Sequence, residues 1–393
     1  MDPISSLTFL GSSGTSVSYN WWIGTFSSNF YYNGGGTSAV DSAGNIYFTA
    51  SLYDGTNYNG HVNKINPQGV TQWVRKYRDT STSSLNIQNL GVDSSDNVYS
   101  MGQNVVAKYN SSGTLQWIKK ATIGSTSALA VVWYGGGVDS AGNVYMAGQS
   151  NDPTTGAFVQ KLNSSGTLQW VSRLWFSSGP YYQGRQCVID EVNDRLYMIW
   201  SQGGIVSRLQ TSTGNNVSTA SYNTNINLNS FGCGMTGYSG EQTLNVVGND
   251  SSNNGYVMVG SGSGWYSSGI PLYCVGVDKT SSISFYFGGA GGRIIKLING
   301  TFSWARQFSS IGDVQSITHA GSGILYAIGN SGIVKIPDDG TRTTGYAISN
   351  FLSSSPPGSA ASYSPSTSNP GYSIATPSYT DVSDSLSISR TSL

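Results

Sequence analysis

Few residues of this 393-residue chain could take part in acid–base or nucleophilic chemistry. It has two histidines, His61 and His319, and charged residues make up 10% of the sequence. Catalysis needs several titratable groups that converge on one place, and such groups are scarce and scattered here. We interpret His61 as a surface residue and His319 as a turn residue. The sequence therefore predicts no catalytic residue and no enzymatic activity. A polysaccharide-degrading hydrolase or lyase is kept as a third hypothesis, after two non-enzymatic ones described below.

A series of aspartates recurs along the chain and could suggest calcium binding. Calcium loops place several oxygen ligands at alternate positions, and each turn here offers only one or two carboxylates beside Ser and Asn. An aspartate in a turn also accepts hydrogen bonds from backbone N–H groups two residues on. We therefore predict that these residues cap turns, with no metal site and no cofactor: Asp41, Asp93, Asp139, Asp190 and Asp250.

Aromatic side chains are the remaining candidates for a binding site. Several of them fall between the repeated segments, where exposed rings could stack on a sugar or anchor a protein partner. Trp265 and Tyr266 come first, because we place them in the longest insertion, which is rich in Gly and Ser. Tyr273, Trp133 and Tyr134 complete the set of predicted ligand-binding residues.

Two repeated phrases determine which elements carry these residues. The first reads Val-Asp-Ser-Ala-Gly-Asn-Ile-Tyr at 40–47, and the second runs from Lys64 through Asn-Pro-Gln-Gly to Trp73. Strong copies of the pair follow at 92–117 and 138–170, and weaker copies of the first phrase follow later. A spacing of roughly 40–50 residues is typical of the four-stranded blade of a β-propeller. The leading positions of the first phrase are 41, 93, 139, 190, 250 and 319.

The residues within each repeat favour strands and turns. Short β-branched and aromatic runs follow Asp, Asn and Gly turn residues, and no segment shows apolar residues at helical spacing. With 51 glycines the chain is also poor in helix formers. We predict an all-β propeller of six blades, or of seven if residues 261–300 contain another blade.

The two ends of the repeat region complement each other. The last repeat reaches Ile333 and Lys335 and then lacks a Trp strand, whereas residues 18–26 supply such a strand with Trp21 and Trp22. An open sheet edge promotes unwanted pairing, and radial closure removes it. We therefore predict that the N-terminal strand completes the last blade and closes the ring.

Composition divides the chain into an N-terminal lead at 1–17, the propeller at 18–344 and a Ser/Thr/Pro-rich tail at 345–393. The alternation Leu386-Ser-Ile388 suggests that the tail adds a strand to a neighbouring molecule, so we interpret the tail as an assembly arm. The net charge is zero, which argues against a nucleic-acid or membrane partner. The first residues do not read as a secretion signal.

The paired phrases resemble the bacterial β-propeller repeats of the SBBP type over residues 18–340. The tail segment Ser-Tyr-Thr-Asp-Val-Ser-Asp-Ser-Leu resembles the ends of virion proteins from tailed phages of marine cyanobacteria. This second resemblance implies a virion protein made in the host cytoplasm, which acts as a tail adhesin or capsid decoration. It would contact other virion proteins through either terminus, with a host surface glycan as a further candidate partner. The alternative is a bacterial propeller scaffold that binds carbohydrate or protein.

Overall fold

A computed structural model describes most of the chain between residues 38 and 340. The gaps are 54–57, 80–86, 103–104, 124–130, 151–156, 176–182, 202–204, 222–232, 239–240, 250–251, 260–263, 279–280, 282–283 and 300. It also describes residues 8–10, 16–18 and 22–26 and six short strands between 352 and 392.

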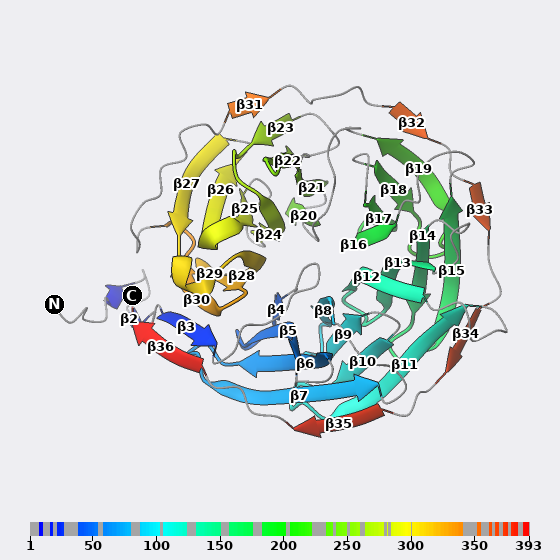
Figure 1. The fold of residues 1–393 in the computed structure, drawn as a ribbon, viewed down its shortest axis with the longest axis horizontal. Coiled ribbons are helices and arrows are strands. Elements are labelled where there is room, and N and C mark those ends of the chain that lie inside the picture. Colours follow the sequence, from blue (N-terminus) through cyan, green and yellow to red (C-terminus); the bar gives the residue numbers. More distant parts are fainter. Residues whose placement is uncertain are drawn as a thin grey trace.

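The described residues form an all-β propeller (Figure 1). Of the eight sheets, one is the isolated pair of β1 (Thr8–Leu10) and β2 (Ser16–Ser18). The remaining seven have four or five strands each and stand around a central axis, so the propeller has seven blades. The predicted fold is confirmed, with the alternative count of seven in place of six.

The blades follow one another in chain order, and each runs from an inner strand to an outer one. Blades 1 to 3 consist of β4 (Ser38–Val40), β5 (Ile46–Tyr53), β6 (Tyr58–Ile65) and β7 (Thr71–Asp79); β8 (Asn89–Val92), β9 (Val98–Gly102), β10 (Val105–Tyr109) and β11 (Leu115–Ile123); and β12 (Val131–Val138), β13 (Val144–Ser150), β14 (Ala157–Leu162) and β15 (Leu168–Trp175). Blades 4 and 5 consist of β16 (Gly184–Asp190), β17 (Arg195–Trp200), β18 (Ile205–Leu209) and β19 (Asn216–Ser221); and β20 (Cys233–Tyr238), β21 (Glu241–Asn249), β22 (Gly255–Val259) and β23 (Gly264–Ser267).

The additional blade is blade 6, which lies where the seven-blade alternative placed it. It comprises β24 (Leu272–Val277), β25 (Ser284–Gly289), β26 (Arg293–Ile298) and β27 (Thr301–Gln307), with a 3-10 turn at Ala290–Gly292. Asp278 ends its inner strand as Asp41 ends that of blade 1. The phrase at Asp250, a residue outside the described set, instead follows the second strand of blade 5. The repeat pattern therefore slips by one strand there, which is why one blade escaped the count.

Blade 7 combines the two ends of the propeller region. Its first three strands, from the axis outward, are β28 (Val314–Gly321), β29 (Ile324–Gly329) and β30 (Gly332–Pro337), preceded by a 3-10 turn at Ser309–Ile311. The fourth strand is β3 (Trp22–Phe26), in which Trp22 pairs with Lys335 and Gly24 with Ile333. The predicted ring closure is confirmed for these residues, and Trp21 lies outside the described set.

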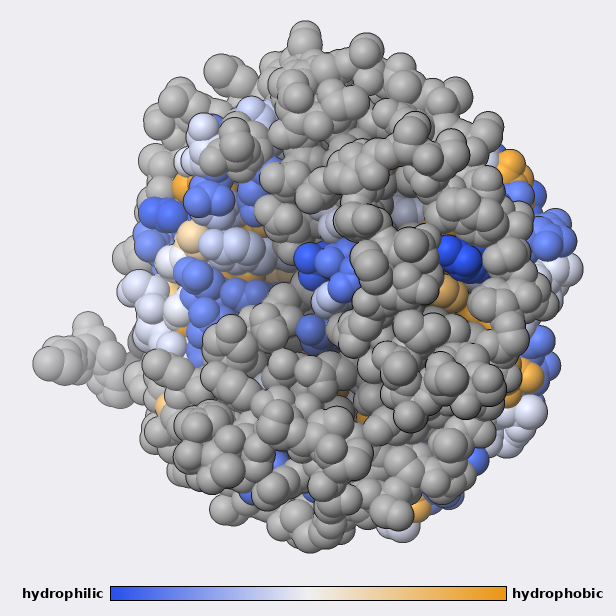
Figure 2. All heavy atoms as spheres, turned by 45° about the vertical axis from the view of Figure 1, so that its right-hand side comes forward, coloured by the Kyte–Doolittle hydropathy of each residue, from blue (hydrophilic) through white to orange (hydrophobic). Residues whose placement is uncertain are grey.

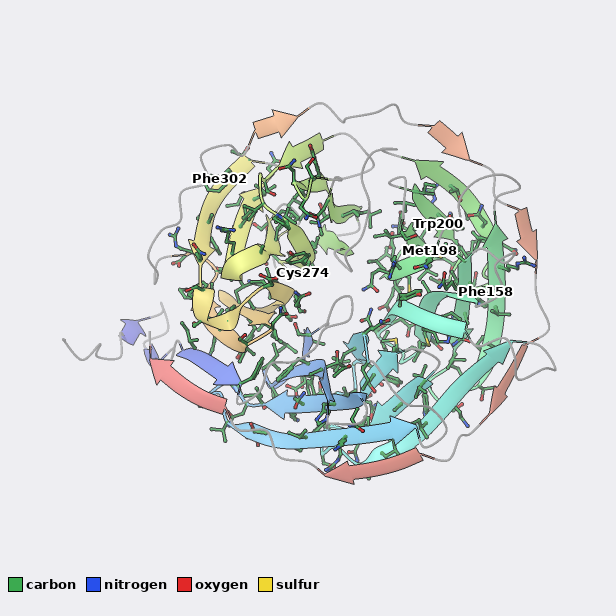
Figure 3. All side chains as sticks on the ribbon, in the orientation of Figure 1. Phe158, Met198, Trp200, Cys274 and Phe302 are labelled. Atoms are coloured by element: carbon green, nitrogen blue, oxygen red, sulfur yellow. The ribbon has the colours of Figure 1, made fainter. Side chains whose placement is uncertain are left out.

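Hydrophobic cores fill the spaces between neighbouring blades. Each of the seven interfaces has its own cluster, which supports the count of seven. Phe158 belongs to the cluster between blades 2 and 3, and Met198 and Trp200 to the one between blades 3 and 4. These side chains lie inside the wall of the ring, whereas Phe302 lies at the outside of blade 6 (Figure 3). Stability therefore depends on contacts from blade to blade.

The aspartate of the first phrase caps its turn, as predicted. Oδ1 of Asp41 accepts hydrogen bonds from the backbone N–H groups of Ala43 and Asn45, at 3.0 and 2.9 Å. The Tyr47 hydroxyl donates to Oδ2 at 2.8 Å, and Nζ of Lys64 lies 3.3 Å from the same oxygen. The first phrase thus links its turn to the second and third strands, and the tyrosine bond recurs in two further blades: Tyr99 to Asp93 and Tyr145 to Asp139.

The lysine and tryptophan of the second phrase fasten each blade to the next. Nζ of Lys64 and Nε1 of Trp73 both donate to one carbonyl oxygen, that of Ser111 in blade 2, at 2.9 and 3.2 Å. Gly113 follows in the same turn with φ of +80°, and a Cβ there would lie 2.8 Å from the Trp73 ring. The turn glycine is therefore required both by its backbone conformation and by the tryptophan that covers it.

We call this arrangement the carbonyl clamp. The same donors reach the next blade at three further interfaces: Lys108 and Trp117 to Ser164, Lys161 and Trp170 to Thr211, and Lys296 and Trp304 to Asp338. At the closure, Nζ of Lys335 donates to the carbonyl of Pro67 in blade 1 at 2.9 Å. The second phrase thus appears in the sequence because it forms the joint between blades.

The tail forms a belt around the ring. Its six strands each pair with the outer strand of a blade, in the order blade 5, 4, 3, 2, 1 and 7, opposite to the order in which the blades were made (Figure 1). The sequence predicts that the tail adds a strand to a neighbouring molecule; here its strands instead pair with the chain's own blades. Of the seven outer strands, only β27 of blade 6 has no belt strand paired with it among the described residues. The belt strands are β31 (Leu352–Ser354) on β23, β32 (Ala361–Tyr363) on β19, β33 (Ser366–Ser368) on β15, β34 (Tyr372–Ala375) on β11, β35 (Tyr379–Ser383) on β7 and β36 (Ile388–Ser392) on β3.

Removal of the belt is expected to expose six outer strand edges and spare the seventh. A chain that ends at Phe351 should show at least ~10-fold faster hydrogen exchange in the outer strands that lose a partner, because those amides lose their hydrogen bonds. Strand β27 serves as an internal control, and its exchange should not change. Equal exchange in both chains, measured by mass spectrometry, would contradict the belt.

Lys335 gives the closure a pH dependence. Burial lowers the pKa of Lys335 to about 8, whereas an unfolded lysine titrates at about 10.4. Between these values the unfolded chain binds a proton that the folded chain has lost, so the free energy of unfolding should rise with pH from about pH 8 to about pH 10.

The variant Lys335→Met should lose this rise in urea unfolding measured between pH 7 and about pH 10. Lys64→Met is the matched control, because Lys64 lies beside Asp41. It should keep the rise but unfold with about 2 kcal/mol less free energy at pH 7, since it leaves Asp41 without its cation. A wild-type slope in Lys335→Met would refute the assignment.

Candidate ligand site on the inner strands

The two faces of the ring differ in how their side chains are used. Antiparallel strands place the turns 41–45 and 66–70 of blade 1 at one end of the blade, which we call the turn face. The loops between second and third strands, and between blades, lie at the opposite end, the loop face. On the turn face, the repeated polar residues bind one another or the next blade, as for Ser42, whose N–H and hydroxyl donate to Asp96 at 2.9 and 2.6 Å.

Inner strands carry β-bulges close to the loop face. Four of them, in blades 3, 4, 6 and 7, have one extra residue at this end that no partner residue opposes, and β28 of blade 7 has a second such residue, Ala320, at its other end. The second strand of each of these blades carries a tyrosine at the position that ends the first phrase, which we call the repeat tyrosine: Tyr145, Tyr197, Tyr286 and Tyr326. The bulged residue stands three positions before the inner-strand residue that pairs with this tyrosine, so all four bulged residues lie at the same level. Bulges often redirect a side chain beside a functional site. The bulged residues are Tyr134, Arg185, Tyr273 and Gln315.

Exposure follows the bulges. Each of the four bulged residues is partly exposed, while the residues immediately before and after it are buried. Blade 2 has Gln88 at the same level, a buried residue whose N–H donates to the Met101 carbonyl. We call the five residues the bulge ring. They place aromatic, amide and cationic groups together around the loop-face end of the axis.

One level further in, a polar contact spans three blades. Nδ2 of Asn89 in blade 2 donates to Oε1 of Gln186 in blade 4 at 2.6 Å. In blade 3 the corresponding position is Gly135, where a Cβ would lie 1.9 Å from the same Gln186 oxygen. The inner strands therefore converge here, and only a glycine leaves room for the amide. This bridge forms a polar floor beneath the bulge ring.

Charge is distributed unevenly in the bulge ring. The guanidinium of Arg185 lies over the Tyr134 ring, with Cζ 4.5 Å from the ring centroid. Burial raises the pKa of the Tyr273 hydroxyl, and the carboxylate of Asp313 adds to this effect. Asp313 is held by the backbone N–H of Gly291 at 2.8 Å. One part of the ring is thus cationic and another is next to an anion.

The structure places two of the predicted binding residues at the same level of the inner strands, in blades 3 and 6, and separates the others from them. Tyr134 and Tyr273 belong to the bulge ring. Trp133 is 1% exposed and packs in the core between blades 2 and 3, so its ring has no free face for a ligand. Trp265 and Tyr266 lie in β23, the outer strand of blade 5, rather than in an insertion, and their side chains are outside the described set.

Sequence reasoning missed Arg185 and Gln315. Neither belongs to a repeated phrase, and a bulge has no residue signature in these strands. The available signal was their position in the sequence, because all four bulged residues stand three positions before the residue that pairs with the repeat tyrosine. That distance becomes informative only when the strand pairing is known.

Both histidine predictions are wrong: His61 is 4% exposed within β6 and is not a surface residue. His319 was expected in a turn but lies inside β28, where it is 1% exposed. Its Nε2 is 3.1 Å from Oδ2 of Asp338, and its Nδ1 is 3.4 Å from Oδ1 of Asp278 and accepts from the Gly321 N–H at 3.3 Å. The ring stacks on Tyr286 at a centroid distance of 5.8 Å. The three acid and imidazole groups, which lie within 4.8 Å of one another, could be considered as metal ligands.

The contacts of this cluster favour an ion-pair network between blades 6 and 7. Both nitrogens of His319 already have partners, and Nζ of Lys296 lies 3.9 Å from the Asp338 carboxylate. A hydrogen bond from His319, together with Lys296, holds the pKa of Asp338 below its usual value despite burial. A cation would have to displace these groups.

The described surface offers no broad apolar patch for docking. Its exposed large hydrophobic residues are spread over blades 1, 4 and 6, and on the face drawn in Figure 2 the orange areas are small and lie among blue and white ones. They are Val70, Val192, Val217, Ile298 and Phe302. Within the part of the chain that is described, no helix is long and apolar enough to cross a bilayer.

Comparison with known proteins identifies the fold. No family model matches the sequence, and no curated protein matches it. A quinohemoprotein alcohol dehydrogenase from Comamonas testosteroni is similar in structure, with a TM-score of 0.52 and 9% identity over 83% of this chain and 77% of that one. The β-propeller domain of Cps50 (Swd1) from Myceliophteria thermophila has a TM-score of 0.51 and 12% identity over 79% and 99%. At such identities the likeness shows the fold alone.

Acid should weaken the contact between blades 6 and 7 through Asp338. Because its pKa is lowered in the folded state, its stabilising effect is present above the unfolded value of about 3.9 and is lost as the pH falls below it. Asp338→Asn should unfold with about 1–3 kcal/mol less free energy at pH 7 and show a shallower loss in acid. Asp339→Asn, an exposed neighbour, is the control. An unchanged acid limb in Asp338→Asn, followed by circular dichroism, would contradict this.

Proposed function

We propose that the chain is a binding scaffold that holds a saccharide at the bulge ring. The observation that carries this proposal is the set of four bulged residues at one level of the inner strands, each partly exposed between buried neighbours. Seven packed interfaces keep such positions fixed, and a preorganised site loses little conformational entropy on binding.

The chemistry of the ring suits a sugar. Tyr134 and Tyr273 offer aromatic faces for the apolar side of a pyranose, while the partly exposed Gln315 offers an amide for its hydroxyls. Binding is favoured over glycoside hydrolysis, because hydrolysis uses two carboxylates on either side of the scissile bond. Besides burial, one carboxylate, that of Asp313, raises the pKa of Tyr273, and the five residues of the bulge ring are themselves neutral or cationic.

The proposal is tested by titration of the full chain with glycans selected on an array. Tyr273→Ala should weaken binding by about ten-fold, because one stacking contact contributes about 1.4 kcal/mol. Phe302→Ala removes an exposed ring from the outside of blade 6 and should have no effect. A loss on Trp265→Ala with full binding by Tyr273→Ala would place the sugar on the outer strand of blade 5 and overturn the proposal.

A finer proposal, that the scaffold is a virion component acting as tail adhesin or capsid decoration, follows from the resemblance of the tail. Its support in the fold is the belt, which covers strand edges that would otherwise pair with other chains on a crowded particle. Electron microscopy of material purified from the native source through this chain tests it. Labelled particles would support display, and a free monomer would refute it.

A further inference from the structure

Arg185 is one of four propeller arginines whose buried Nε makes no hydrogen bond, with Arg173, Arg208 and Arg293. Of these four, Arg185 is the one whose guanidinium lies over an aromatic ring among the described residues, that of Tyr134. Nε of Arg75 and of Arg306 donates to the turn carbonyl of the next blade, at Gly113 and Gly340. Nε of Arg185 is buried and has no hydrogen-bond partner. Among the described residues, Arg185 also has no carboxylate within ion-pair distance, and its recorded contact is the Tyr134 ring.

Such a group is costly unless something satisfies it. A buried donor without an acceptor destabilises the folded chain, and the partly exposed guanidinium has no counterion among the described residues. Burial accordingly lowers the pKa of Arg185. Nothing in the packing of the blades requires a guanidinium here, since the cation–π contact alone is a modest gain.

The Tyr134 hydroxyl is a second hydrogen-bond donor that lacks an acceptor. Its hydroxyl oxygen accepts a hydrogen bond from Nε2 of Gln149 at 2.8 Å, which fixes the ring under the guanidinium. The hydroxyl proton is then left without an acceptor among the described residues. Two residues before Arg185, Oε1 of Gln183 is a buried acceptor without a donor. Two donors without acceptors, together with an acceptor two residues away in sequence, match an anionic group next to a hydroxyl.

We propose that Arg185 and Tyr134 form a subsite for the carboxylate of an acidic saccharide, a hexuronic acid. This inference rests on the proposed function and specifies its ligand class. The planar fork of a guanidinium binds a carboxylate through two parallel hydrogen bonds, and stacking on an aromatic ring keeps the fork in place. The Tyr134 hydroxyl would donate to the same carboxylate, and the Gln183 carbonyl oxygen would accept from a sugar hydroxyl.

The test is calorimetric titration of the full chain with oligogalacturonate and with the same oligosaccharide after reduction of its carboxyl groups. Arg185→Gln should weaken binding of the acidic form at least ~10-fold and leave the reduced form unaffected, since a charged hydrogen-bonded pair is worth about 1.5–3 kcal/mol. Arg185→Lys should restore part of the affinity. Arg195→Gln, which removes a guanidinium from the turn-face end of the same blade, is the control and should bind as the wild type does.

Thermal unfolding provides a second readout. A structural arginine would destabilise the chain when replaced, whereas Arg185→Gln removes an uncompensated charge and should unfold at the same or a higher temperature. A lower unfolding temperature with unchanged affinity would overturn the inference.

The remaining outcomes separate this inference from the proposed function. If the reduced saccharide binds as tightly as the acid and depends on Tyr273 but not Arg185, the proposed function stands and the carboxylate subsite fails. If neither binds, and array glycans bind independently of the bulge ring, both fail. Binding of a polyglutamate peptide through Arg185 in place of the saccharide would overturn the assignment to a sugar.

Discussion

The propeller depends on two hydrogen bonds to one carbonyl oxygen. Lys64 and Trp73 of one blade both donate to Ser111 of the next, and a glycine two residues later lies flat against the tryptophan. This joint does not depend on the loops, and it recurs at other interfaces with only the acceptor residue changed. Because it fixes neighbouring blades through the backbone, the inner strands beyond it can carry bulges and unsatisfied groups without loss of the ring.

How much of the fold the sequence predicts depends on how closely each blade keeps both phrases. Blades 1 to 3 keep both, and there the strands, capped turns and tryptophan positions are predictable from residue type alone. Blade 4 replaces Lys with Arg208 and has no tryptophan at the clamp position, and its interface with blade 5 has a hydrophobic cluster without a described clamp. Blade 6 keeps Lys296 and Trp304 but lacks the Asp-Ser-x-Gly-Asn turn, so its first half is invisible to a search for the first phrase.

The candidate site is predictable only in part, for a physical reason. Tyr134 and Tyr273 attract attention as aromatic residues outside the phrases, but aromatic type does not distinguish them from Trp133, one residue away and buried in a core. The distinction is made by a bulge, which is a property of two strands in register. Arg185 shows the same limit, since nothing in its neighbours Gly184 and Gln186 indicates that its guanidinium lacks a counterion.

The belt determines the order in which the molecule can be taken apart. Strand β3 lies between β30 and β36, so a strand from before the blades and a strand from the tail meet in one blade, and the tail strand covers the earlier one. A pull on the C-terminus would open β36 end-on and then release β35, β34 and the others one at a time, while the blades beneath keep their own four strands. The tail could thus extend under load, one strand at a time, while the ring stays closed.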